Sequence, residues 1–226
     1  MVAVDGRDLV GPTDVTDEGV LVTAGGRVDL LVTATARVDV GAGTALVVGP
    51  RGTRVAPRPE PDRRVDLLGY GTPAALPFDP DHADRHFEFR IDRRIGLVDG
   101  KPGFWWTIDG HLFPDVPMFH VTEGDVVRMT ISNDSGDVHP MHLHGHHAVV
   151  LSRNGVRSTG STWWVDSLNV ADGDTYEIAF VADNPGIWMD HCHNLEHARD
   201  GLVAHLAYAG VTDPYRVGGR ADNEPE

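Results

Sequence analysis

Cysteine is almost absent from this sequence. Cys192 is the only cysteine in 226 residues, which excludes an internal disulfide framework and any zinc site built from several thiolates. Long apolar runs are also missing, since none approaches the roughly 18 consecutive residues of a membrane-spanning helix. Residues 1–6 lack the charged and apolar regions of a secretory signal peptide. The composition therefore favours a chain that folds around its own core without cross-links.

Basic side chains are scarce relative to acidic ones. The 19 Lys and Arg residues face 34 Asp and Glu residues, which leaves a formal net charge of −15, and Lys101 is the only lysine. No basic stripe is available to neutralise phosphate groups, so nucleic acid is excluded as a partner. The same balance argues against binding to an anionic membrane surface. With 41% hydrophobic residues, the chain has the composition of an ordinary globular protein.

Short apolar runs with a period of two dominate the chain after residue 84, and Gly, Pro and Asp interrupt them. This alternation is typical of half-buried β-strands, and residues 86–92, 126–131 and 174–181 show it most clearly. Asn154-Gly155 predicts a tight turn between two such runs. The pattern predicts an all-β fold, either a sandwich or a barrel.

The sequence divides into parts of different composition. Residues 1–55 contain strand-like runs that are too few to close a sandwich, and residues 56–84 are rich in Pro and charge, as linkers are. Residues 85–212 are long enough for one complete β domain, and residues 213–226 have the composition of a disordered tail. We therefore expect the end of one β domain, a linker, a complete β domain and a tail.

Histidine is the residue in surplus. Eight of the 13 histidines fall in residues 139–147 and 191–197, and the second segment also holds Cys192. Imidazoles with a single thiolate suit copper, zinc or iron, and copper held by two histidines, one cysteine and a weak axial ligand is the blue electron-transfer site. Such a set is available, because His197 lies five residues after Cys192 and His139 lies in the neighbouring predicted strand.

Strand geometry indicates how these residues could serve two sites. Side chains alternate along a strand, so His191 and His193 would point to one face and Cys192 to the other. By the same rule, His142 and His144 would share a face. One strand can therefore hold copper through its thiolate on one side and present two imidazoles to a second metal site on the other.

Two segments resemble the C-terminal copper motifs of the multicopper oxidases, the laccase-like cupredoxin proteins. They are residues 139–146, His-Pro-Met-His-Leu-His-Gly-His, and residues 191–202, His-Cys-His-Asn-Leu-Glu-His-Ala-Arg-Asp-Gly-Leu. Further similarity to the last domain of that family lies in residues 106–110, 113–119 and 182–188, and residues 24–32 are similar to the closing strands of its middle domain. The resemblance covers nearly the whole chain. It implies a cupredoxin-like Greek-key β-sandwich at residues 85–212, preceded at residues 1–55 by the terminal strands of another cupredoxin-like domain.

The resemblance also implies an oxidoreductase with copper as its cofactor. The matched metal ligands are His139, Cys192 and His197 for type 1 copper, His142 for type 2 copper, and His144, His191 and His193 for the type 3 pair. In this family, electrons from a small reducing substrate enter at type 1 copper and pass through the catalytic link of Cys192, His191 and His193. A trinuclear copper cluster then reduces dioxygen to water. Leu202 takes the axial place at type 1 copper, where a side chain without a donor atom leaves the reduction potential high.

Two departures from the family pattern affect the expected activity. The family takes half of its trinuclear-cluster histidines from the first domain, yet residues 1–138 contain only His82, His86, His111 and His120, none in a His-x-His pair. We therefore expect the C-terminal portion of a longer oxidase or one part of a split enzyme. Such a chain would be inactive alone and would depend on an N-terminal cupredoxin domain in cis or in trans. Ala198 also stands where many bacterial members carry an acid that helps deliver protons, so no proton-relay residue is identified.

The histidines also allow other interpretations. Zinc is the rival metal, whereas a cupin site is disfavoured because no Glu follows His144 at three or four residues. Copper nitrite reductase shares the cupredoxin fold but has a longer gap between its cysteine and the next histidine ligand. His146, His147 and His205 fit packing roles better than ligand roles.

The sequence leaves several points of function open. The alternative to an oxidase is a blue-copper electron-transfer or copper-binding module without enzymatic activity, and a metal-free β-sandwich interaction domain is a weaker third. The reductant, whether a phenol, an aromatic amine or a metal ion, is not named by the sequence, nor is the oligomeric state. Members of the family are usually exported to the periplasm, the cell surface or the medium, so the same location is implied here.

Overall fold

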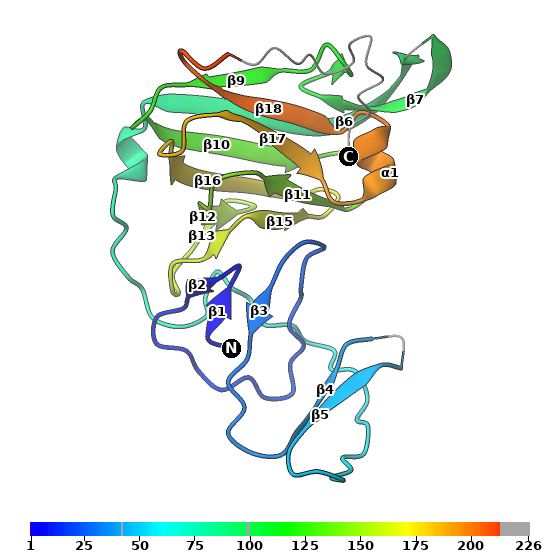
Figure 1. Cartoon of the computed structure of the whole chain (residues 1–226), viewed down its shortest axis with the longest axis vertical. Helices are drawn as coiled ribbons and strands as arrows, with labels where there is room; N and C mark the ends of the chain where they lie inside the picture. Colours follow the sequence, from blue (N-terminus) through cyan, green and yellow to red (C-terminus); the bar gives the residue numbers. More distant parts are fainter. Residues whose placement is uncertain (42, 99, 213–226) are drawn as a thin grey trace.

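The computed structural model describes residues 1–41, 43–98 and 100–212, and its main body is a β-sandwich of two sheets (Figure 1). This arrangement confirms the predicted all-β fold. The predicted tail at residues 213–226 lies outside the described residues.

The larger sheet contains, in spatial order, β13 (Val156–Arg157), β12 (Ala148–Arg153), β16 (Thr175–Val181), β10 (Val126–Asn133), β6 (Arg85–Val98), β7 (Lys101–Ile108) and β8 (His111–Leu112), with β14 (Trp164–Val165) beside β12. The smaller sheet contains β15 (Ser167–Val170), β11 (His139–Leu143), β17 (Ile187–Cys192), β18 (Val203–Tyr208) and β9 (Met118–Val121). Spatial neighbours are mostly not consecutive in the chain, so the chain crosses repeatedly between the sheets, as in Greek-key sandwiches.

Alternating burial explains why the predicted runs form strands. In β10, Val127, Met129 and Ile131 are buried in the core between the sheets, whereas Arg128 and Thr130 on the other face are only half-buried. A strand with one face toward the core buries every second side chain, and those side chains are the apolar ones. Asn154 and Gly155, both with positive φ, form the predicted turn between β12 and β13.

The two histidine-rich segments end up on neighbouring strands. β11 pairs antiparallel with β17, with Met141 opposite Cys192 and His142 opposite His191. A short helix, α1 (Leu195–Arg199), follows β17 directly and turns the chain back toward β18. This register brings residues more than forty positions apart in the sequence within reach of one another.

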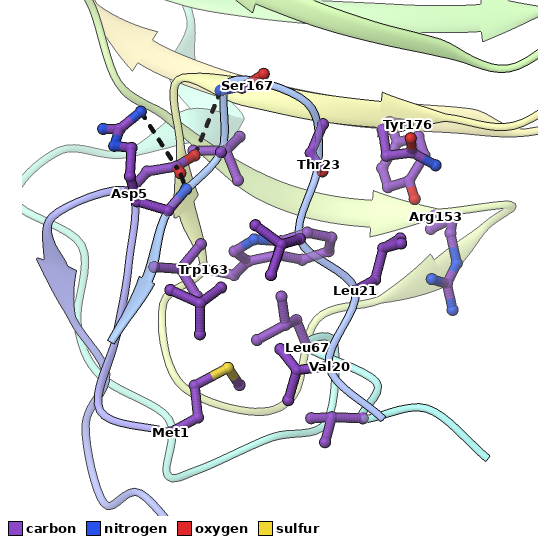
Figure 2. A pocket seen from close by; sticks show the side chains of 18 residues that line it. Met1, Asp5, Val20, Leu21, Thr23, Leu67, Arg153, Trp163, Ser167 and Tyr176 are labelled. Atoms are coloured by element: carbon purple, nitrogen blue, oxygen red, sulfur yellow. Dashed lines mark hydrogen bonds and ion pairs between the residues drawn. The ribbon is translucent and has the colours of Figure 1, made fainter. Parts of the chain in front are cut away.

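Residues from the N-terminal part pack onto the sandwich near β13 and β15 (Figure 1). They form a small sheet of β1 (Ala3–Val4), β2 (Arg7–Asp8) and β3 (Val28–Asp29), and a hairpin of β4 (Ala36–Asp39) and β5 (Ala45–Val48). Met1, Val4 and Leu9 are buried in the same core cluster as Trp163 of the sandwich. Figure 2 shows Met1, Val20 and Leu67 gathered around the Trp163 indole.

The segment 56–84, expected to be a linker, is partly packed. Leu68 and Tyr70 are buried in the core cluster, and the Leu68 carbonyl accepts hydrogen bonds from the backbone N–H groups of Thr159 and Gly160. The segment ends in a single 3₁₀ turn, η1 (Pro80–His82), just before β6. The part of the segment around Leu68 and Tyr70 therefore packs against the sandwich and helps to hold the N-terminal part in place. Within the described residues, no helix is long and apolar enough to cross a membrane.

Candidate metal centre

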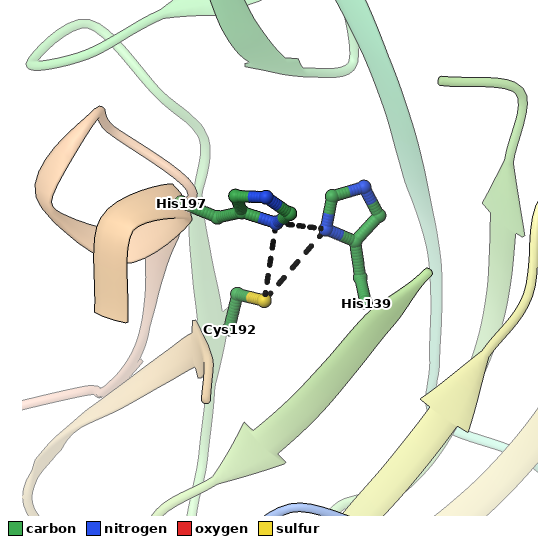
Figure 3. A group of neighbouring side chains, drawn as sticks. All are labelled: His139, Cys192 and His197. Atoms are coloured by element: carbon green, nitrogen blue, oxygen red, sulfur yellow. Dashed lines mark hydrogen bonds between the residues drawn. The ribbon is translucent and has the colours of Figure 1, made fainter. Parts of the chain in front are cut away.

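The first donor set, which we call the cysteine site, consists of His139, Cys192 and His197 (Figure 3). His139 begins β11, Cys192 ends β17, and His197 lies on α1. The Cys192 Sγ is 3.7 Å from His139 Nδ1 and 3.9 Å from His197 Nδ1, and the two Nδ1 atoms are 3.1 Å apart. All three potential ligand atoms lie within 4.8 Å of one another, so one metal ion could contact them together.

A hydrogen-bond chain orients His139 toward this site. The imidazole is fully buried, and its Nε2 lies 2.8 Å from Ser135 Oγ, which donates to Asn133 Oδ1 at 2.7 Å. Ser135 Oγ therefore accepts a hydrogen bond from His139 Nε2–H, which leaves the Nδ1 lone pair directed at Cys192. Buried imidazole ligands are commonly held in this way through the nitrogen that does not bind the metal.

Asn194 organises the other side of the cysteine site. Its backbone N–H donates to Cys192 Sγ at 3.3 Å, and its side-chain Oδ1 accepts from the backbone N–H of Glu196 at 3.2 Å as the N-cap of α1. The cap starts the helix that carries His197. One residue thus holds the sulfur and fixes the position of an imidazole.

Burial sets the protonation states of the cysteine site. It raises the pKa of the Cys192 thiol to about 11, and burial followed by repulsion from His197 lowers the pKa of His139 to about 4. The imidazoles are therefore neutral and available as ligands near neutral pH, while the thiol needs a bound cation to ionise it. Neutral imidazole nitrogens with an ionisable sulfur form a donor set that fits copper.

Apolar groups close the cysteine site. The Trp106 ring lies 4.3 Å from the His197 ring and 4.7 Å from the His139 ring, and it is 5% exposed. Leu202 is fully buried and adjoins the site through its backbone, because its carbonyl accepts from Cys192 N–H and its N–H donates to the His197 carbonyl. Its side chain has no donor atom, consistent with the non-coordinating axial role expected for it.

The second donor set, which we call the histidine cluster, lies on the opposite face of β11 and β17. It consists of His142, His144, His191 and His193, whose ring centroids are 4.7 to 5.8 Å apart in the contacting pairs. His144 Nε2 and His191 Nε2 are 2.9 Å apart. The structure therefore brings together all the histidines predicted to face a second site, and it separates them from Cys192 as strand alternation predicts.

In the histidine cluster, the Nδ1 atoms of His142 and His191 form hydrogen bonds with the backbone, whereas their Nε2 atoms point toward the other rings. His142 Nδ1 donates to the Asp166 carbonyl at 2.7 Å, and His191 Nδ1 donates to the Cys192 carbonyl at 3.2 Å, which leaves both Nε2 atoms as acceptors. Burial lowers the pKa of His191 to about 4, so its imidazole is neutral. His193 Nε2 is buried without a hydrogen-bond partner among the described residues. A buried nitrogen of this kind needs an explanation, and a bound metal ion would provide one.

The N-terminal part covers one side of the histidine cluster. Gly25 has a φ of +81°, and a Cβ atom at this position would lie 2.6 Å from Cε1 of the His193 ring. Only glycine fits such a backbone conformation at such a short distance. No sequence pattern predicts this contact, because the resemblance of residues 24–32 to strands of another domain carries no information about their packing on His193.

The remaining histidines lie outside both donor sets. His146 Nδ1 donates to the His144 carbonyl and its Nε2 accepts from the Tyr208 hydroxyl, while His147 contacts the Asp5 carbonyl. His205 is buried on β18. His82, His86, His111 and His120 are exposed and make no ring contact with the histidine cluster in the part of the chain that the structure describes.

Comparison with known proteins places this sequence in a family. A sequence model described as multicopper oxidase matches residues 87–210, more than half of the chain. Multicopper oxidase MmcO of Mycobacterium tuberculosis is 34% identical over 103 residues, which are 46% of this chain and 20% of that protein. Iron transport multicopper oxidase fio1 of Schizosaccharomyces pombe is 39% identical over 93 residues, which are 36% of this chain and 15% of that protein. The chain thus spans a fifth or less of the length of these curated relatives.

Solved structures confirm the fold. The blue copper oxidase of Nitrosomonas europaea aligns with a TM-score of 0.54 at 22% identity, covering 64% of this chain and 50% of that chain. Fet3p, a multicopper oxidase that functions in iron import, aligns with a TM-score of 0.55 at 19% identity, covering 74% of this chain and 38% of that chain. These alignments confirm the predicted cupredoxin-like β-sandwich.

Proposed function

The chain belongs to the multicopper oxidase family, and from that premise we propose that it takes part in copper-dependent oxidation of a small reducing substrate coupled to dioxygen reduction. The observation that carries the proposal is the cysteine site, where the Nδ1 atoms of His139 and His197 converge on Cys192 Sγ from three separate elements. Relatives named as laccases and as iron transport oxidases leave both organic and metal-ion reductants as candidates.

We assign type 1 copper to the cysteine site and half of a trinuclear copper cluster to the histidine cluster. In this assignment His142 binds type 2 copper, and His144, His191 and His193 bind the type 3 pair. Copper at these sites would supply reversible one-electron chemistry. Cys192 is covalently joined to His191 on one side and to His193 on the other, so the backbone provides a short path between the two donor sets.

The histidine cluster needs further ligands to serve as an oxygen-reducing site. It offers four imidazoles, and the other histidines of the described residues lie in the cysteine site, on the surface or in packing positions. We propose that the remaining imidazoles come from a further cupredoxin domain, in cis or in trans, that docks on this face. Export to the periplasm, the cell surface or the medium is proposed with the family assignment.

The incomplete cluster also supports a second candidate function. A chain with a complete cysteine site and only half of the second site could act as a blue-copper electron carrier or a copper-binding module. Copper stoichiometry separates the candidates, because an oxidase assembly should hold about four copper ions and a carrier about one per chain.

Copper loading under anaerobic conditions tests the proposal. The loaded chain should show an intense blue absorption band from sulfur-to-copper charge transfer, and Cys192→Ser should abolish it. A colourless loaded chain, or a Cys192→Ser variant that remains blue, would refute the assignment of the cysteine site. His205→Ala, which alters a buried histidine outside both donor sets, is the matched control and should stay blue.

A further inference from the structure

A stacked arginine stands beside the cysteine site without belonging to it. The guanidinium carbon of Arg93 lies 4.4 Å from the centroid of the Trp106 ring, and Trp106 in turn lies 4.3 Å from the His197 ring. Arg93 is paired with Trp106 across the β6–β7 hairpin, so the strand register fixes this contact. The positive charge of Arg93 is therefore separated from His197, a proposed copper ligand, by the Trp106 ring.

The hairpin places the cation of Arg93 among apolar groups. On the same face, Ile91 and Ile108 are fully buried in the core, while Ile95 and Phe104 near the tip are exposed. Arg93 stands between these apolar groups, with its guanidinium carbon also 4.6 Å from the Phe104 ring centroid. Its Nε atom is buried and has no hydrogen-bond partner among the described residues. Leaving a buried N–H unpaired is costly, and the contacts of the guanidinium with the two rings hold the charge at this position despite that cost.

We propose that Arg93, stacked on Trp106, raises the reduction potential of type 1 copper at the cysteine site. This inference rests on the proposed function, because it requires copper between His139, Cys192 and His197. Reduction of Cu(II) to Cu(I) removes one positive charge, so a nearby fixed cation favours the reduced state. The effect adds to that of Leu202, whose side chain offers no axial ligand.

The buried surroundings of Trp106 reduce the screening of this electrostatic effect by water, although the Arg93 side chain is 30% exposed. The indole is 5% exposed and His139 is fully buried, so little solvent lies between the guanidinium and the donor atoms. Asp137 opposes the effect, because its Oδ2 lies 3.3 Å from Arg93 Nη1 and its negative charge acts on His139 and His197 at least as strongly as the charge of Arg93. Removing the charge of Arg93 and removing the charge of Asp137 should therefore shift the type 1 reduction potential in opposite directions.

Redox titration of the blue band provides the test. Arg93→Met keeps an unbranched stem that can pack on Phe104 and Trp106, and it should lower the type 1 potential. Asp137→Asn should raise it. We expect a change in the Cu(II)/Cu(I) ratio at fixed applied potential on the order of tenfold for Arg93→Met, equivalent to about 59 mV for a one-electron couple. Arg94→Met removes an equal charge from an exposed neighbour on the other face and should change the potential much less.

The outcomes separate this inference from the proposed function. A parent chain that never turns blue refutes both. A blue parent whose potential is unchanged in Arg93→Met, or shifted equally in Arg94→Met, refutes only the role of Arg93. If Arg93→Met fails to form the blue site, Asp137→Asn decides alone: a raised potential supports the inference, and an unchanged or lowered one overturns it.

Discussion

The two faces of β11 and β17 present donor sets of different completeness. In the cysteine site, His139 is held through Ser135, the sulfur is held through the Asn194 N–H, and Trp106 closes the space around the imidazoles. The histidine cluster offers four imidazoles, and in the part of the chain that the structure describes no further histidine ring contacts it. A donor set with a full set of supporting contacts can bind its metal alone, whereas a partly satisfied one needs a partner. We therefore expect one chain to contain one self-sufficient and one dependent copper site.

The sharpest test of this comparison removes the thiolate. Cys192→Ser should abolish the blue band completely, because the charge transfer originates on sulfur, and His197→Ala should bleach it as well. The histidine cluster should keep whatever weak copper binding it has, since its ligands face the other side of the sheet. Absorption and copper analysis of the loaded variants would check both statements. Equal loss of all copper from Cys192→Ser would mean that the two sites are not independent.

Oxygen consumption tests the dependent site. The 226-residue chain, loaded with copper, should show no appreciable oxygen uptake with a good laccase substrate, because half of the cluster cannot enforce the copper separations that four-electron reduction requires. Supplying an N-terminal cupredoxin domain of the family, in cis or in trans, should restore uptake. An oxygen electrode gives the result directly. Sustained uptake by the chain alone, lost in His142→Ala and His193→Ala, would show that it builds a working cluster itself.

A smaller effect is expected on the copper affinity of the cysteine site, the self-sufficient one. Ser135→Ala removes the acceptor of the His139 Nε2–H bond and should weaken copper binding by roughly 10- to 100-fold. Competition with a chelator, read from the blue band, measures the loss. Ser158→Ala, which removes a part-buried serine hydroxyl that bonds the Leu68 carbonyl and belongs to neither donor set, is the control and should bind copper like the parent. Unchanged affinity in Ser135→Ala would show that packing alone orients His139.

The sequence predicts some of these features and not others, for physical reasons. Strand alternation separates Cys192 from His191 and His193, because a period of two is a local property of the backbone. The all-β fold likewise follows from local alternation in β10. The contacts of Trp106 with the imidazoles arise from packing between distant strands, which no local pattern encodes. The copper-ligand roles themselves remain predictions.

Gly25→Ala probes the dependent site through the backbone that covers it. A non-glycine residue at a φ of +81° costs about 1 to 3 kcal/mol, and the added Cβ would meet the His193 ring. The variant should unfold at lower denaturant concentration and bind metal less well at the histidine cluster, while its blue band stays in place. Gly100→Ala, also at positive φ but with open space around it, controls for backbone strain alone. A similar loss at the cluster in both variants would remove the special role of the Gly25 contact.

The smallest expected effect is a fine adjustment at the self-sufficient site. Leu202→Met would place a weak thioether ligand in the axial position, stabilise Cu(II) and lower the type 1 potential. Leu202 is fully buried, and Met has a similar volume with a flexible chain, so the substitution should cost less than about 1.5 kcal/mol of stability. Leu206→Met, at another fully buried leucine that lies on β18, controls for the change in core packing and should leave the potential near that of the parent. The surrounding apolar shell also tunes the potential, so the sign of the difference between the two variants carries the test. A Leu202→Met potential equal to or above that of the parent would mean that this side chain does not lie over the copper.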